Sequence, residues 1–334
     1  MSYRLPVRQA TSDATGMPPA ISSGPHPWSG FIERDWGGGR LHRTAGDALP
    51  PPAVSRVESA AGWWEFVRAA PDPRLRGLVA GRFGYRERAQ APIQRRLPAT
   101  SLIPVVLSLG ERLEVVEVVD GRGAGRSYES LVAGFQPGHA LTRITGAQFG
   151  LRMYLTPLGA YRILGIPGSA LAWGVHHLEE IAPSLVRSLP DRLASLPTWA
   201  ERFAVVDEVI AQMADRGREP DPLVEWVWRQ LQASGGRVRI ADLVAKSGWS
   251  HRHVISRFRD HLGVTPKTAA NVVRFERAAA ALVSQRWSLA EVAARYGYAD
   301  QSHLTRDFVR FAGNTPAVHV GSYRPSAPGA TGQP

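Results

Sequence analysis

Hydrophobic residues between about positions 63 and 155 come in short runs separated by turn residues. The clearest runs are 102–107, 113–119, 131–135 and 149–155. Their length and their content of Val, Ile and Tyr are typical of β-strands, and Asp120-Gly121 is typical of a turn. The pattern therefore predicts a small, mostly β barrel or sandwich in this part of the chain.

Beyond about residue 159 the apolar positions repeat with the period of an α-helix. Thr198 and Glu201 have the spacing of a capping box, which begins a helix. An apolar stripe on that helix fits either the core of its own domain or a contact with a second subunit. We favour the core, because single stripes of this length are common in monomeric proteins. The stripe consists of Phe203, Val206, Ile210 and Met213.

The C-terminal part of the chain contains one pattern of about fifty residues twice. Segment 240–248 aligns with 289–297, and each copy continues with a second periodic segment and ends in Gly-x-Thr-Pro. A helix, a tight turn and a second helix form a helix-turn-helix unit. The sequence therefore predicts two such units, joined by a helix over about 267–285.

Glycine and apolar positions are expected to hold each unit together. Glycine adopts the left-handed conformation that ends a first helix at little cost, and Ser250 and Asp300 are suited to cap the second helices. The residues predicted to be structural are Gly248, Val254, Phe258, Gly263 and Pro266 in the first unit and Gly297, Leu304, Phe308, Gly313 and Pro316 in the second.

The second helix of a helix-turn-helix unit lies in the major groove, so its outward residues meet base edges. Because Arg can pair with guanine and Gln with adenine, we expect Arg252, Gln301 and Arg306 to read bases. A solvated helix face explains any one of them alone, whereas two matching units joined by a helix of about one DNA turn favour DNA binding. The predicted DNA-binding residues are His251, Arg252, Ile255, Ser256, Arg259, Gln301, Ser302, Thr305, Arg306 and Arg310.

The formal net charge of +11 is concentrated in the repeated region. Residues 237–324 contain 14 Lys and Arg but 6 Asp and Glu, a net charge of +8. Such a local basic excess is typical of a surface that contacts phosphates. A membrane surface would also attract basic residues, but their place among two helix-turn-helix patterns favours nucleic acid.

These motifs resemble the C-terminal domain of the AraC/XylS family of bacterial transcription regulators. The resemblance is carried by Gly248-Trp-Ser-His-Arg-His-Val254, Arg274-Phe-Glu-Arg-Ala278 and Gly297-Tyr-Ala-Asp-Gln-Ser-His-Leu-Thr-Arg-Asp-Phe308, with Gly313-x-Thr-Pro316. It implies regulation of transcription through promoter DNA, contact with RNA polymerase, and an N-terminal sensor or dimerisation domain that is often a cupin-like barrel. Ser256, His251 and Val244 depart from the usual family residues, which weakens the prediction that the first unit reads bases strongly.

Several kinds of chemistry are excluded or disfavoured by the residues present. The chain has no cysteine, so it has no disulfide, thiolate metal site or cysteine nucleophile. A cupin metal site needs converging histidines and a carboxylate. His176-His177 with Glu179-Glu180 is the only such cluster in the N-terminal region, and adjacent side chains point apart. No Gly-x-Ser-x-Gly motif is present. We expect no enzymatic activity, no metal and no cofactor.

The predicted fold class is α+β, with four segments. Residues 1–55, rich in Pro, Gly, Ser and Ala, are expected to be disordered. A sensor or dimerisation domain is expected at 56–220, the DNA-binding domain at 221–323 and a disordered tail at 324–334. No stretch reaches the ~20 apolar residues that span a bilayer, and we expect a cytoplasmic protein.

Two functions remain open at this point. The first is a sequence-specific regulator whose N-terminal domain senses a small-molecule effector, forms a homodimer, or both. The second is a DNA-binding protein whose N-terminal domain serves only assembly or contact with a protein partner, without a ligand.

Overall fold

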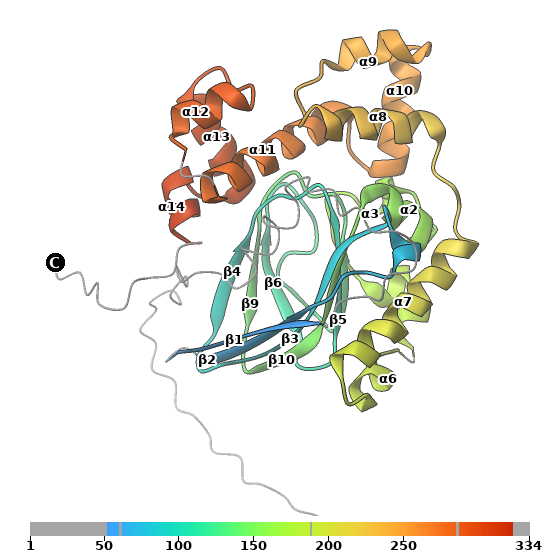
Figure 1. Ribbon diagram of the computed structural model, residues 1–334, viewed down its shortest axis with the longest axis vertical. Coiled ribbons are helices and arrows are strands. Elements are labelled where there is room, and N and C mark those ends of the chain that lie inside the picture. The colour runs from blue at the N-terminus through green and yellow to red at the C-terminus, as the bar shows by residue number, and fades with distance from the viewer. Residues whose placement is uncertain (1–51, 60–61, 188, 285–286, 323–334) are drawn as a thin grey trace, which may run out of the picture.

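A computed structural model describes residues 52–59, 62–187, 189–284 and 287–322. It has a mostly β N-terminal domain and an all-α C-terminal region (Figure 1). The predicted α+β fold class is confirmed. The predicted disorder of residues 1–55 falls almost entirely outside the described residues, as does that of the tail. The first strand begins at Ala53, three residues before the expected start of the N-terminal domain.

The N-terminal domain contains two antiparallel sheets. The strands are β1 Ala53–Ser59, β2 Gly62–Arg68, β3 Val79–Ala89, β4 Ile93–Leu97, β5 Ile103–Ser108, β6 Leu113–Val118, β7 Arg126–Tyr128, β8 Ser130–Ala133, β9 Ala140–Ile144, β10 Ala147–Leu155 and β11 Val175–His177. One sheet has the order β1-β2-β3-β10-β5-β8-β11 and the other β4-β9-β6-β7. Phe83, Tyr128 and Tyr154 belong to an apolar core between them. The predicted small β domain is confirmed.

Each of the four runs recognised in the sequence forms a strand. They correspond to β5, β6, β8 and β10. Asp120 lies in the turn after β6 with a positive φ of 56°, as Asp tolerates. Along β10 the side chains alternate: Met153 and Leu155 join the core under the helices, while Tyr154 points into the space between the sheets. This alternation gives the seven-stranded sheet two apolar faces.

Helices cover the outer face of the seven-stranded sheet. They are the 3₁₀ turn η1 Pro73–Leu75 and the α-helices α2 Pro157–Leu164, α3 Gly168–Leu171, α4 Leu178–Ile181, α5 Pro183–Val186, α6 Leu189–Ser195 and α7 Trp199–Arg216. The predicted capping box begins α7. Its stripe packs in the core of its own domain: Phe203, Val206 and Ile210 are buried and Met213 packs partly buried beside them.

Two contacts join α7 to the sheet closely. Gly84 lies under the Trp199 ring, and a Cβ at position 84 would approach Trp199 Cζ3 to 2.0 Å. The buried guanidinium of Arg82 pairs with the Asp207 carboxylate and donates a hydrogen bond of 3.2 Å to the carbonyl oxygen of Phe203. Burial lowers the pKa of Arg82 to about 10. The ion pair therefore fixes α7 where apolar contacts alone would allow it to slide.

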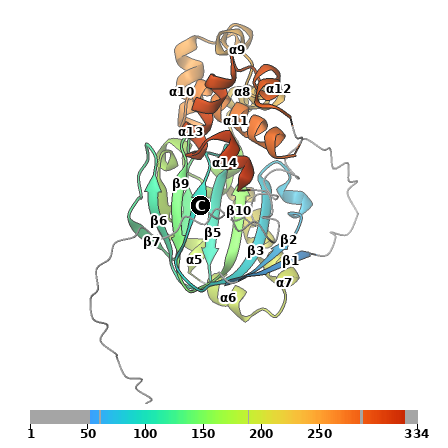
Figure 2. The ribbon, with the colours of Figure 1, turned by 90° about the vertical axis from the view of Figure 1, so that its left-hand side faces the viewer.

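The C-terminal region contains seven helices among the described residues. They are α8 Pro222–Ala233, α9 Ile240–Ser247, α10 His251–Leu262, α11 Pro266–Ser284, α12 Leu289–Arg295, α13 Gln301–Ala312 and α14 Pro316–Gly321. The pairs α9–α10 and α12–α13 lie at opposite ends of α11, and all of them lie at one end of the β domain (Figures 1 and 2). Two helix-turn-helix units joined by a helix are therefore present, as predicted.

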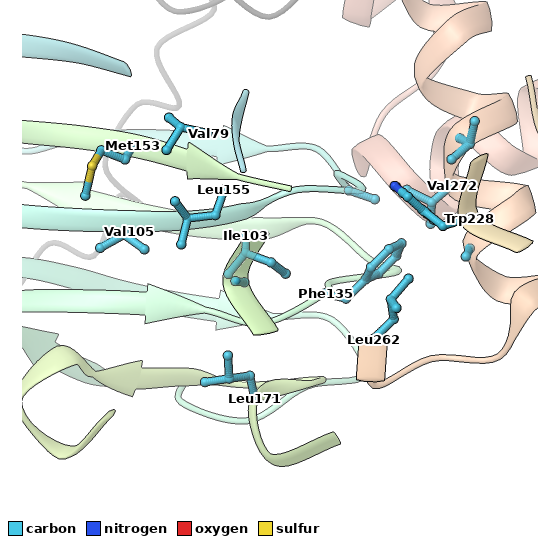
Figure 3. Packing of buried hydrophobic residues seen from close by; sticks show 14 of the residues in the cluster. Val79, Ile103, Val105, Phe135, Met153, Leu155, Leu171, Trp228, Leu262 and Val272 are labelled. Atoms are coloured by element: carbon cyan, nitrogen blue, oxygen red, sulfur yellow. The ribbon is translucent and has the colours of Figure 1, made fainter. Parts of the chain in front are cut away.

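The hydrophobic core does not stop at the expected boundary near residue 220. One cluster runs from the outer face of the seven-stranded sheet into the C-terminal helices. In Figure 3, Phe135, which follows β8, points toward Leu262 at the end of α10, and Trp228 of α8 lies beside Val272 of α11. The DNA-binding region is thus packed against the β domain. No helix in the described ranges is long and apolar enough to cross a membrane.

Candidate DNA-binding surface and interdomain cavity

The first recognition helix, α10, begins and ends at residues suited to those places. Gly248 ends α9 in the left-handed conformation, with φ 73°. The Ser250 hydroxyl then accepts a hydrogen bond of 3.2 Å from the backbone N–H of His253 and caps α10. Because that N–H has no partner within the helix, the cap stabilises the end that would enter a DNA groove.

The faces of α10 agree with the sequence pattern. Val254 and Phe258 are buried, with exposed fractions of 1% and 0%. Four of the five predicted DNA-binding residues in this helix are exposed, and Ile255 is half-buried. The exposed residues are His251, Arg252, Ser256 and Arg259.

The second recognition helix, α13, repeats this arrangement. The Asp300 carboxylate accepts a hydrogen bond of 2.7 Å from the backbone N–H of His303. Leu304 and Phe308 are buried. Among the predicted DNA-binding residues, Thr305 is half-buried, while Gln301, Ser302, Arg306 and Arg310 are exposed.

Two arginines of α13 differ in what holds them. Arg306 Nε donates a hydrogen bond of 3.3 Å to the carbonyl oxygen of Ser302, one turn earlier in the same helix. Arg310 lies with its Cζ 5.2 Å from the centre of the Phe311 ring, near the C-terminal end. Arg306 thus lies in the second turn of α13, and Arg310 near its C-terminal end.

The sequence reasoning missed two features of the first unit. Trp249 is 54% exposed and its ring stacks on that of His253, with centroids 4.3 Å apart. Its position in the turn directly before the Ser250 cap is the signal that could have marked it as a surface group. Arg257 is exposed but paired with Asp221 at 2.6 Å, so it joins α10 to the residue that caps α8.

Helix α11 sets the distance between the two units. Its 19 residues span about 28 Å at 1.5 Å per residue, which is close to the ~34 Å of one DNA turn. Val272, Phe275 and Ala278 on this helix are buried, and the Phe275 ring packs edge-on against that of Phe308 at 5.1 Å. The connection is therefore a packed helix.

A cavity of about 170 Å³ lies in the β domain where α11 covers it. Its walls are mostly apolar and come from both sheets, with Val106 and Leu131 from the seven-stranded sheet and Val115 from the other. The segment 97–100 forms part of the rim, and α11 contributes residues from Phe275 to Ala280. Residues of both domains thus line the same space, a common location for small-molecule sites.

A minority of the side chains that line this cavity are polar, and Glu276 and Gln136 among them have defined hydrogen bonds. Glu276 Oε1 accepts hydrogen bonds of 2.9 Å from Thr100 Oγ1 and 2.8 Å from the backbone N–H of Ser101. Burial raises the pKa of Glu276, and these hydrogen bonds oppose the rise. The buried Gln136 donates from Nε2 to the carbonyl oxygen of Gly174 at 3.0 Å, while its Oε1 has no hydrogen-bond partner among the described residues.

The histidine and glutamate cluster at 176–180 does not converge. His176 Nε2 lies 3.0 Å from the carbonyl oxygen of Leu171, and the His177 ring packs on Tyr128 with centroids 4.5 Å apart. Within the residues that the structure describes, no group of three His, Asp or Glu side chains is arranged to hold a metal ion.

Comparison with known proteins places this region in a family. A family model described as a helix-turn-helix domain matches residues 243–320. Over 95 residues the chain is 32% identical to the probable transcription factor PqrA of Proteus vulgaris, and the match covers 28% of this chain and 77% of that protein. The chain belongs to the AraC/XylS family of transcription regulators.

Two other AraC-type proteins are also similar to this chain. The chain is 35% identical over 94 residues to the F1 operon positive regulatory protein of Yersinia pestis, covering 28% of this chain and about a third, 31%, of that protein's length. The structure of ToxT from Vibrio cholerae O395 is 11% identical, with a TM-score of 0.41, and the match covers 70% of this chain and 97% of that one. As an AraC-type protein, the chain is a DNA-binding regulator of transcription.

Proposed function

We propose that this regulator binds promoter DNA in a sequence-specific manner through both helix-turn-helix units, and that its N-terminal domain responds to a small-molecule effector. The DNA-binding domain in this proposal is 221–323 and the sensor domain 56–220. The observation that carries the DNA proposal is the duplication: α10 and α13 both bury an apolar face and expose a polar one at the two ends of a packed helix.

The proposed contacts to DNA divide by position along the two helices. Arg252, Gln301 and Arg306 lie in the first two turns and are suited to base edges. The remaining proposed contacts position the protein on phosphates and sugars or contact bases through apolar and hydroxyl groups. They are His251, Ile255, Ser256, Arg259, Ser302, Thr305 and Arg310.

Selection of bound fragments from the source genome tests the DNA proposal. The full chain is mixed with sheared genomic duplex at physiological salt in the presence of competitor polynucleotide, because non-specific binding by a basic protein falls steeply with salt. We expect one or a few enriched sites with two footprints about one DNA turn apart. Equal recovery of all fragments would refute sequence-specific binding.

The cavity supports the effector part of the proposal. Its lining is mostly apolar with a minority of polar groups, the combination found in small-molecule sites. A ligand that binds only the folded state raises the melting temperature, so a metabolite library screened by thermal unfolding tests this point. An occupant of the cavity should lose its stabilising effect in an Ala133→Leu variant, since Ala133 lines the cavity and the larger side chain fills part of it.

The alternative function, assembly without a ligand, also has an observation in its favour. Strand β1 stands at the end of the seven-stranded sheet and pairs with β2. Val54 on this strand and Trp63 on β2 are 56% and 41% exposed. Among the described strands β1 pairs with β2 alone, and such a strand edge with apolar side chains can pair with a second copy of the chain. Dimers in solution that are lost on Val54→Lys, together with a ligand screen that finds no stabilising compound, would favour this function.

Contact with RNA polymerase stays a prediction from the family.

A further inference from the structure

The N-terminal domain contacts both recognition helices at their C-terminal ends. At the first unit, the Tyr161 ring of α2 stacks on His261 of α10, with centroids 4.4 Å apart. The backbone of Gly168 lies so close to α10 that an added Cβ would be 2.2 Å from the carbonyl oxygen of His261. This contact holds the end of α10 on the α2–α3 corner.

At the second unit the contact is made by the rim of the β domain. The backbone N–H of Ala99 donates a hydrogen bond of 2.7 Å to the carbonyl oxygen of Phe311 in α13. His139 Nδ1 lies 3.4 Å from the carbonyl oxygen of Arg310. Next to these, Thr100 and the Ser101 N–H hold Glu276 of α11. The last turn of α13 and the middle of α11 are therefore bound to one short segment.

The two contacts differ in their relation to the cavity. Segment 97–100, which binds α13, also forms the cavity wall, and Glu276 lines the cavity as well. Gly138 and Ala140, on either side of His139, line it too. The cavity lining includes neither Tyr161 nor Gly168. A change inside the cavity can therefore reach the second unit through the segment that binds α13. It reaches the first unit less directly, through Phe135, which lies between the lining residues Ala133 and Gln136 and points toward Leu262 of α10.

We propose that the segment 97–102, with Glu276 as a positioning residue, couples the contents of the cavity to the docking of the second helix-turn-helix unit and leaves the first unit fixed. This inference rests on the proposed effector function of the cavity. An occupant that touches the wall binds the docked and undocked arrangements with different affinity, and it shifts their populations by that difference. Because both readers must meet one duplex, a shift of one of them changes the affinity for a two-part site.

Hydrogen exchange on the full-length protein tests the coupling without DNA and without a known ligand. Glu276→Ala and the milder Thr100→Val remove hydrogen bonds at the second contact, and Tyr161→Ala removes the ring stack at the first. Ala133→Leu imitates an occupant, since Ala133 lines the cavity and no hydrogen bond of the contact involves it. Circular dichroism confirms that each variant is folded.

For Glu276→Ala and Thr100→Val we expect amides in 309–321 to exchange roughly fivefold faster, the effect of about one net hydrogen bond, with 251–263 unchanged. Tyr161→Ala should give the opposite distribution. Ala133→Leu should alter exchange in 309–321 more than in 251–263. Equal changes in 251–263 and 309–321 would overturn the coupling. So would unchanged exchange in 309–321 in folded Glu276→Ala and Thr100→Val, or in folded Ala133→Leu.

Footprinting on the selected DNA sites adds a second readout. Glu276→Ala should weaken protection of the half-site bound by α13 and keep that of the half-site bound by α10, and equal weakening of both would contradict the inference. Failure of the proposed function is distinguishable, because it would show as no enriched DNA or no stabilising ligand for the unmodified protein while the exchange pattern of the variants remained as expected.

Discussion

Single side chains on α13 allow base reading to be separated from phosphate contact. Arg306→Ala should lower the affinity for a selected site by about 1–3 kcal/mol and relax the preference at one base pair, because it removes the base contact proposed for this residue. Arg310→Ala should weaken binding to all sequences alike and reduce the salt dependence, because it removes the phosphate contact proposed for this residue. Titrations of specific and random duplexes at several salt concentrations measure both effects.

Arg257 supplies a matched control for these two variants. It is an exposed arginine of α10 that pairs with Asp221, so Arg257→Ala should leave both the base preference and the salt dependence unchanged. If Arg306→Ala weakened specific and random DNA equally, Arg306 would not be a base reader.

The buried pair between Arg82 and Asp207 makes a prediction about stability. Asp207→Asn should destabilise the fold by about 3 kcal/mol, because it leaves the Arg82 guanidinium buried without its counter-charge. The double variant Arg82→Met with Asp207→Leu should lose much less, since it removes both charges. Chemical unfolding of the two variants measures the difference, and equal losses would show that the cost comes from packing rather than charge.

At the scale of elements, helix ends were the most predictable features. The caps at Ser250 and Asp300 and the capping box at Thr198 were expected from residue type and spacing alone, because a cap involves only a few neighbouring residues. Strand β4 was not expected. Its Arg95 points between the sheets and pairs with Glu87 at 2.9 Å, so a buried position carries a charge and the apolar pattern of a strand is hidden.

Helix α12 depends on a second capping box, which can be tested. The Ser288 hydroxyl accepts a hydrogen bond from the Glu291 N–H, and the Glu291 carboxylate accepts one of 2.7 Å from the Ser288 N–H. Ser288→Ala should cost about 1 kcal/mol and speed hydrogen exchange in 289–295. Ser288→Asp should keep most of the cap, because a carboxylate can accept the same bond. Equal exchange in both variants would contradict this account.

At the scale of the whole molecule, the sequence indicated which parts exist but not how they join. The two helix-turn-helix units follow from a repeat within the chain, so their residues are close in sequence. Glu276 and Thr100 are hydrogen-bonded although they are 176 positions apart in the sequence. Tyr161 and His261 stack although they are about 100 positions apart. Neither pair forms a local pattern. The core shared by the two domains was missed for the same reason, because the sequence of an apolar stripe does not identify the surface that it packs against.

The pH dependence of stability reports on this shared core through His319 of α14. Its ring lies near those of Phe308 and Phe275, with centroids 5.3 and 6.4 Å away, and burial lowers the pKa of His319 to about 4. The unfolded chain takes up a proton near its ordinary pKa of 6.5, whereas the folded chain does so only near 4. The contribution of His319 is therefore complete above pH 6.5 and is lost as the pH falls toward 4.

Between those values the free energy of unfolding should decrease by about 1.4 kcal/mol per pH unit on account of this one group. His319→Phe keeps a ring among Phe275 and Phe308 but cannot take up a proton, so it should flatten the decrease.

Glu276 should affect stability in the opposite direction of pH, because the pKa of its carboxyl group is raised in the folded protein. The contribution of Glu276 to stability is complete below about pH 4.5 and is lost as the pH rises through the raised pKa. Glu276→Gln cannot lose a proton and so avoids this loss. The amide should therefore stabilise the protein at neutral pH, and urea unfolding between pH 4 and 8 measures both effects. An unchanged slope below pH 6.5 in His319→Phe would show that α14 does not hold this histidine neutral in the core.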